Sequence, residues 1–221
     1  MTKYTIKIHN KSDHVQNFLL FNSPPTKPTS VGIWSNVWAK SPGVGHPHGN
    51  AQFTITSDLY AVCGMTDQSL DHGVNVSTAD SHKVDIKASS RNGTKVTVDI
   101  KGGGAVFENT ISTTSTNGCY AINTTAYHSS DYPNVFVGLG RQKGDDVIPV
   151  AVWSADPSED YEIAPVEKFF VSTGNYREGD AVNVSELGKT VTFDFTGTAH
   201  TAATTTFQDD GTYTSPTYSD S

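Results

Sequence analysis

The stretch KVDIKASSRNGTKVTVDIKG, residues 83–102, decides the fold class. Apolar and polar residues alternate on both sides of its Asn92–Gly93 pair. Because successive side chains of a strand point to opposite faces, this period of two predicts two half-buried strands. The Asn-Gly pair suits the positive φ of a two-residue turn, so we expect the two strands to form a hairpin. The apolar positions are Val84, Ile86, Val96, Val98 and Ile100.

Short runs of the same kind follow one another along the whole chain. YTIKIHN and QNFLLFN, residues 4–10 and 16–22, are separated by a polar turn and predict a second hairpin at the start. No amphipathic helical period persists beyond two turns. We therefore expect an all-β protein, a single-domain antiparallel β-sandwich or flattened barrel of about a dozen short strands. Further runs are AQFTITS (51–57), LYAVCGM (59–65), NVFVGLG (134–140), VIPVAVWSA (147–155) and KTVTFDF (189–195).

The length of the chain, 221 residues, fits one core. We expect a β-sandwich domain over residues 1–198. Residues 199–221 are poor in bulky aliphatic side chains and rich in Thr and Ser. This composition predicts a C-terminal edge strand or a loosely held tail.

Charge and hydropathy limit the partners and the compartment. A net charge of -8 provides no basic field for nucleic acid, so we expect none as a partner. No stretch approaches the roughly 18 apolar residues of a membrane span. The N-terminus enters a strand pattern without a signal-like apolar region, which predicts a cytoplasmic protein. Cys63 and Cys119 lie in apolar runs, so we expect reduced thiols packed as small hydrophobes.

GVGHPHG, residues 43–49, is the first candidate site. On an extended backbone His46 and His48 project to one side and could share a metal ion. A third ligand is needed, and the spacing selects none. The alternative, which we favour, is a tight corner between strands, fixed by Gly45, Pro47 and Gly49.

A second candidate is the polar loop AYHSSDYPNVF, residues 126–136. Its aromatic rings, imidazole and carboxylate are groups that orient a sugar or a polycyclic molecule, and we predict ligand contacts at Tyr127, His128, Asp131 and Tyr132. The alternative is that the tyrosines cap the end of the sandwich and the polar side chains are solvated.

Two tryptophans complete the predicted site. Trp34 and Trp38 are four residues apart, so on one continuous strand both would face the same way. Such a pair packs in the core or, on an exposed face, forms a stacking platform for a ligand.

The combination of YTIKIHNKS, LYAVCG, VFVGLGR, PVAVW and PVEKFFVSTGNY resembles a group of small fungal β-rich proteins with no assigned activity. The resemblance spans nearly the whole chain and implies a β-sandwich. The opening IxNxS, with a later Gly-Asn turn before FTI, is also similar to aegerolysin and actinoporin-like cytolysins. Because the tryptophan-dense membrane loops of those proteins are missing, that similarity implies only the sandwich.

Two functions remain open. The first is binding of a small organic molecule or a glycan, without a cofactor, by a protein whose oligomeric state is open and includes a homodimer. The second is a cofactor-independent cyclase or isomerase that folds a small apolar substrate in an enclosed pocket. A Ser-His-Asp hydrolase is not expected, because no GxSxG elbow occurs. A deep cavity with a buried histidine would favour catalysis, and a shallow aromatic shelf would favour binding.

Overall fold

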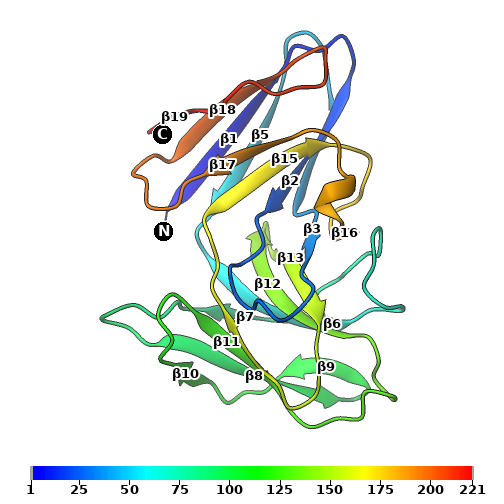
Figure 1. The fold of residues 1–221 in the computed structure, drawn as a ribbon, viewed down its shortest axis with the longest axis vertical. Helices are drawn as coiled ribbons and strands as arrows, with labels where there is room; N and C mark the ends of the chain where they lie inside the picture. Colours follow the sequence, from blue (N-terminus) through cyan, green and yellow to red (C-terminus); the bar gives the residue numbers. More distant parts are fainter. Residues whose placement is uncertain (1, 221) are drawn as a thin grey trace.

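The computed structural model describes residues 2–220, which form four β-sheets and one short 3-10 helix, η1 (Val184–Glu186) (Figure 1). We number the sheets I to IV. Sheet I has the order β19 (Thr217–Ser219), β18 (Ala202–Phe207), β1 (Lys3–Asn10), β5 (Gly49–Thr56). Sheet II has the order β17 (Thr190–Asp194), β15 (Lys168–Thr173), β2 (Gln16–Asn22), β4 (Ala39–Val44).

Sheets III and IV form the other part of the molecule. Sheet III has the order β16 (Ala181–Val182), β3 (Trp34–Asn36), β13 (Asp146–Ser154), β12 (Val135–Lys143), β6 (Leu59–Met65), β7 (Asp80–Val84). Sheet IV has the order β10 (Ser112–Thr114), β8 (Gly93–Lys101), β11 (Tyr120–Thr124), β14 (Asp160–Ile163), and β9 (Gly104–Phe107) also pairs with β8. The predicted all-β sandwich is confirmed, but residues 2–220 form nineteen strands instead of about a dozen, and two pairs, β1 with β18 and β8 with β11, are parallel instead of antiparallel. The strand order of each sheet is open, so the flattened barrel is not formed.

The sheets stack in two pairs that share one core. Figure 1 shows sheets I and II in the upper half and most strands of sheets III and IV below them, whereas β3 and β16 of sheet III lie beside β2. Between sheets I and II, the Phe18 and Phe207 rings meet edge to face at 5.6 Å. Between sheets III and IV, the Tyr120 hydroxyl donates to the Gly138 carbonyl at 3.2 Å. Buried side chains of all four sheets belong to one continuous apolar cluster, and burial of such surface is the main stabilising contribution to the fold.

Both predicted hairpins are wrong. β1 pairs with β5 and with β18, while β2 pairs with β15 and β4. β7 pairs with β6, whereas β8 pairs with β9, β10 and β11. The reason is that in each predicted hairpin the two strands belong to different sheets. The turn closed by Ala88 and Arg91 carries the chain from sheet III to sheet IV. Gly93 is needed for close packing instead, because a Cβ there would collide with the Cys119 carbonyl oxygen.

The C-terminal residues contribute two strands to sheet I. β18 lies between β1 and β19 and runs parallel to β1, with Ala203 and Phe207 buried. β19 forms the edge of the sheet. Division of the chain at residue 198 stays a prediction.

Cys63 and Cys119 are buried free thiols, and burial raises the pKa of both.

Among the described residues, no helix has the length and apolar character that crossing a membrane requires.

Candidate functional site

The GVGHPHG motif carries the chain from one sheet to another. β4 ends at Val44 in sheet II, and β5 begins at Gly49 in sheet I. The Gly49 amide donates to the Gly45 carbonyl at 3.0 Å, and a Cβ on Gly49 would collide with that oxygen. The motif is therefore the tight corner that we favoured from the sequence.

Within the described residues, the structure provides no third ligand for a metal ion held by His46 and His48. Both imidazoles are exposed at the corner. Within residues 2–220, no three His, Cys, Asp or Glu side chains gather closely enough to hold a metal ion. With only two exposed ligands, the corner has fewer than the three that transition-metal sites normally take from the protein.

A groove opens where β4 and β5 diverge. Each of these strands is the last of its sheet, so the two sheets separate along them. The turn between β12 and β13 borders the same groove, whose volume is about 590 Å³. We call it the Trp38 groove. It is lined by Lys3, Leu20, Trp38, Ala39, Lys40, Ser41, Pro42, Gln52, Phe53, Thr54, Thr56, Gln142, Lys143 and Gly144.

Two polar atoms of the groove lining are buried and have no hydrogen-bond partner among the described residues. These are the indole Nε1 of Trp38 and the hydroxyl Oγ1 of Thr56. Trp38 is 2% exposed, and its backbone amide donates to Leu20 in the neighbouring strand. An unsatisfied buried polar group costs about 1–3 kcal/mol, so such groups are uncommon and call for an explanation.

Arg141 lies fully buried beside these two residues. Its NH1 group donates to the Thr56 carbonyl at 3.0 Å, and its Nε donates to Asn22 Oδ1 at 2.7 Å. Its NH2 group meets the Glu167 carboxylate at 3.2 Å. Burial lowers the pKa of Arg141 and the Glu167 charge raises it, but an arginine stays charged. A single side chain from sheet III therefore joins sheets I and II at the groove.

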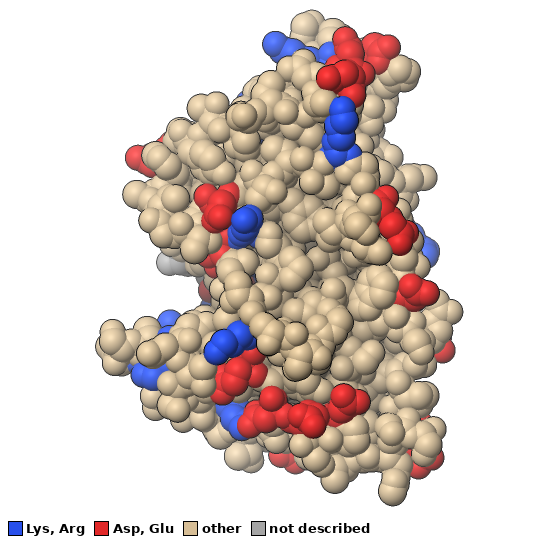
Figure 2. Space-filling model, in the orientation of Figure 1, with Lys and Arg blue, Asp and Glu red and all other residues tan. Residues whose placement is uncertain are grey.

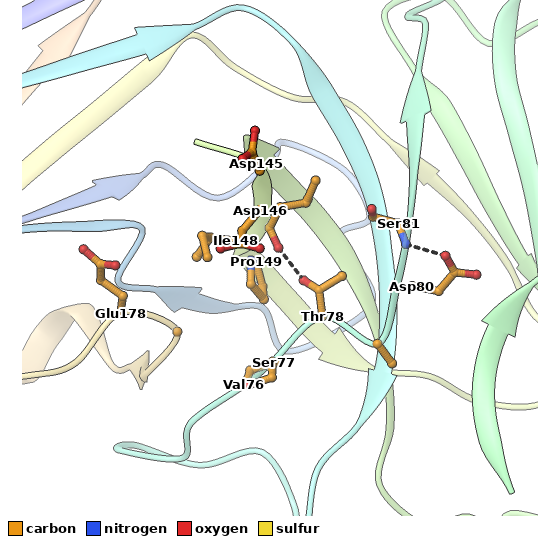
Figure 3. A pocket seen from close by; sticks show the side chains of 13 residues that line it. Val76, Ser77, Thr78, Asp80, Ser81, Asp145, Asp146, Ile148, Pro149 and Glu178 are labelled. Atoms are coloured by element: carbon orange, nitrogen blue, oxygen red, sulfur yellow. Dashed lines mark hydrogen bonds between the residues drawn. The ribbon is translucent and has the colours of Figure 1, made fainter. Parts of the chain in front are cut away.

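An acidic cleft of about 500 Å³ lies on the other side of the β12–β13 turn (Figure 3). The Asp80 carboxylate accepts hydrogen bonds from the backbone amides of Ser81 and Phe107, at 2.8 and 2.9 Å. Glu178 accepts from the Lys40 amide and from Lys143 Nζ. The acidic side chains that line this cleft are Asp80, Asp145, Asp146 and Glu178.

Trp34 and Trp38 do not form a shared platform. Trp34 lies on β3 and packs against the cluster that holds Val62 and Phe136. Trp38 follows the end of β3 and enters the main core. The two are not on one continuous strand, so the even spacing did not place them on one face. Trp34 lines a separate, mostly apolar pocket of about 380 Å³.

The Tyr127 loop lies apart from the Trp38 groove. The Tyr127 hydroxyl donates to the Ala155 carbonyl at 2.6 Å, and burial together with nearby Tyr161 and Asp156 raises its pKa to about 12. Tyr132 packs against the core, whereas His128 and Asp131 are exposed. The four residues lie in one loop, and their role in ligand binding stays a prediction.

Comparison with known proteins identifies the family. A family model described as RhiA matches residues 1–216. The chain belongs to the RhiA family. The expectation of a relationship across nearly the whole chain is thereby confirmed at the level of a family, and the fungal source stays a prediction. No curated protein and no solved structure matches this RhiA family member.

Sequence reasoning found Trp38 but missed its neighbours in the groove. Thr56, Lys3 and Lys143 lie in three different strand segments, and no local spacing relates them. Arg141 directly follows the apolar run of β12, and a charged residue that continues such a run was the available signal.

Proposed function

We propose that this RhiA family member binds a small polar organic ligand, with a glycan as the leading class, in the Trp38 groove. The carrying observation is a ligand-sized groove whose wall contains two buried, unpartnered polar atoms, Trp38 Nε1 and Thr56 Oγ1, which a small side-chain shift would present to a ligand. A groove of about 590 Å³ falls within the usual range of small-molecule sites.

The lining supports a polar ligand with many hydrogen-bond acceptors. The indole N–H of Trp38 is a donor only, and the Thr56 hydroxyl both donates and accepts. Leu20 and Phe53 supply apolar surface beside them. Sugars present this combination, since their hydroxyl groups accept and donate and their C–H faces pack on apolar side chains.

The energetics favour a ligand over a packing defect. Each unpartnered group reduces the stability of the free protein, and a ligand that bonds to it would recover that cost on binding. Sites where residues are less than optimal for stability are often sites of function.

The cyclase or isomerase alternative stays a prediction that no specific observation favours. The groove is rimmed by lysines and amides rather than being an apolar enclosure with a buried histidine. Binding is therefore the function that the groove supports best.

The test is a ligand screen followed by two matched variants. Saturation-transfer NMR of the purified full chain against neutral and acidic mono- to tetrasaccharides would identify binders. Thr56→Val keeps the shape of the side chain and removes the hydroxyl, so it should weaken the best binder by about 2- to 10-fold through one lost hydrogen bond. Thr192→Val, at an exposed position of β17 outside the groove lining, is the control.

His128→Ala tests the competing loop site. If His128→Ala abolishes binding and Thr56→Val leaves it unchanged, the ligand lies at the Tyr127 loop and the groove proposal is wrong. Absence of any binder in the screen would also count against it.

A further inference from the structure

The Trp38 groove is basic, although the chain carries a net charge of -8. Lys3, Lys40 and Lys143 line it, and no aspartate or glutamate does. On the face drawn in Figure 2, by contrast, basic side chains lie next to acidic ones. Ion pairs of this kind include Lys83 with Asp58 and Lys95 with Asp160.

The three lysines differ in how far they are neutralised. Lys143 pairs with Glu178, which belongs to the acidic cleft on the far side of the β12–β13 turn. Lys40 Nζ donates to the Tyr176 carbonyl at 3.1 Å and makes no ion pair among residues 2–220. Lys3 has neither a hydrogen-bonded nor an ionic partner for its side chain within the described chain.

One turn therefore separates two clefts of opposite charge. Asp145 and Asp146 face the acidic cleft, while Gln142 and Lys143 face the Trp38 groove. A concave surface lined by charges of one sign concentrates the potential and attracts ligands of the other sign. The acidic cleft would repel an anion, so a negatively charged ligand has one favourable location at this turn.

We infer that the ligand of the Trp38 groove carries a carboxylate, and that it is an acidic saccharide of the hexuronate class. This inference rests on the proposed function and specifies the ligand class. The sugar ring packs against Thr56 and the apolar wall, and the carboxylate faces the lysine rim. The lining holds no arginine fork, and no helix begins there, so it lacks the two features most typical of phosphate recognition.

The experiment compares a hexuronate trimer with its fully methyl-esterified form by titration calorimetry of the full chain. The two probes have the same rings and differ in charge. At low salt the acid should bind at least 10-fold more tightly than the ester, and 0.5 M salt should reduce that ratio severalfold. Lys3→Gln should weaken binding of the acid about 3-fold or more and leave the ester unchanged. Lys11→Gln, which removes the same charge from an exposed lysine outside the groove lining, is the control.

The outcomes separate this inference from the proposed function. Equal binding of acid and ester would overturn the carboxylate and leave the groove as a site for neutral ligands. An acid preference that persists in a Lys3→Gln, Lys40→Gln, Lys143→Gln triple variant would also overturn it, since the groove lysines would not be its source. If neither trimer binds but a neutral sugar binds in a Thr56-dependent way, only this inference fails. If nothing binds, both fail.

Discussion

The guanidinium carbon of Arg141 lies 5.8 Å from the centre of the Trp38 ring, within the range of a cation–π interaction. The same guanidinium lies 5.1 Å from the Phe169 ring. The buried charge and the groove wall are therefore one packed unit, and a change in Arg141 should affect both stability and binding.

Arg141→Met should destabilise the protein by about 3 kcal/mol. Methionine fills much of the volume but leaves the fully buried Asn22 Oδ1 and the partly buried Glu167 carboxylate without their donor. Urea denaturation measures the free energy of unfolding. Arg91→Met is the control, because Arg91 and its partner Asp85 are both more than half exposed, and it should change stability by no more than about 0.5 kcal/mol. A loss as small at Arg141 would contradict the network.

Thr56→Val and Thr205→Val should differ in their effects on stability. The Thr56 hydroxyl has no partner to lose, so its removal should leave the free energy of unfolding unchanged or increase it. The buried Thr205 hydroxyl donates to the Thr214 carbonyl at 2.7 Å, and its removal should cost about 1–3 kcal/mol. Thermal melts of both variants without ligand check the pair. A clear destabilisation by Thr56→Val would indicate that its hydroxyl has a bonded partner in the free protein.

Gly49→Ala should destabilise the sheet crossover by about 1–3 kcal/mol, because its methyl group would collide with the Gly45 carbonyl oxygen. Gly45→Ala meets no atom within 4 Å and should change stability by no more than about 0.5 kcal/mol. Chemical denaturation of the two variants gives the comparison. Equal effects would show that the corner does not depend on the close approach of its two glycines.

Thr125→Val should make stability less dependent on acid pH. The Thr125 hydroxyl donates to Asp99 Oδ1 at 2.7 Å, and this bond holds the pKa of Asp99 below its usual value. A lowered folded-state pKa adds stability above the unfolded-state pKa, and that stability is lost as the pH falls through the folded value. The wild type should therefore be more stable than the variant at pH 7, and the two should converge as the pH falls below the lowered folded-state pKa of Asp99. NMR titration of Asp99 should show its pKa rise in Thr125→Val; an unchanged pKa would exclude the hydroxyl as the cause.

The all-β class could be predicted from the sequence because the period of two is local. In the stretch 83–102, Val84, Val96 and Val98 are buried, as their alternation predicts. The corner at residues 43–49 was also readable, since glycine and proline restrict the backbone wherever they occur. Trp38 could be named as a candidate site residue from the sequence, because a tryptophan ring can stack on a ligand.

The choice of strand partners and the groove depended on the tertiary structure. Val84 and Val96 have the same local pattern, yet they lie in sheets III and IV, because pairing depends on which distant strands complete each buried face. Lys3, Thr56 and Lys143 meet only when β1, β5 and β12 are assembled. The sequence by itself determined the strands and their buried faces, through local periodicity. Only the tertiary structure decided the site, because its residues are brought together by packing between sheets and not by spacing along the chain.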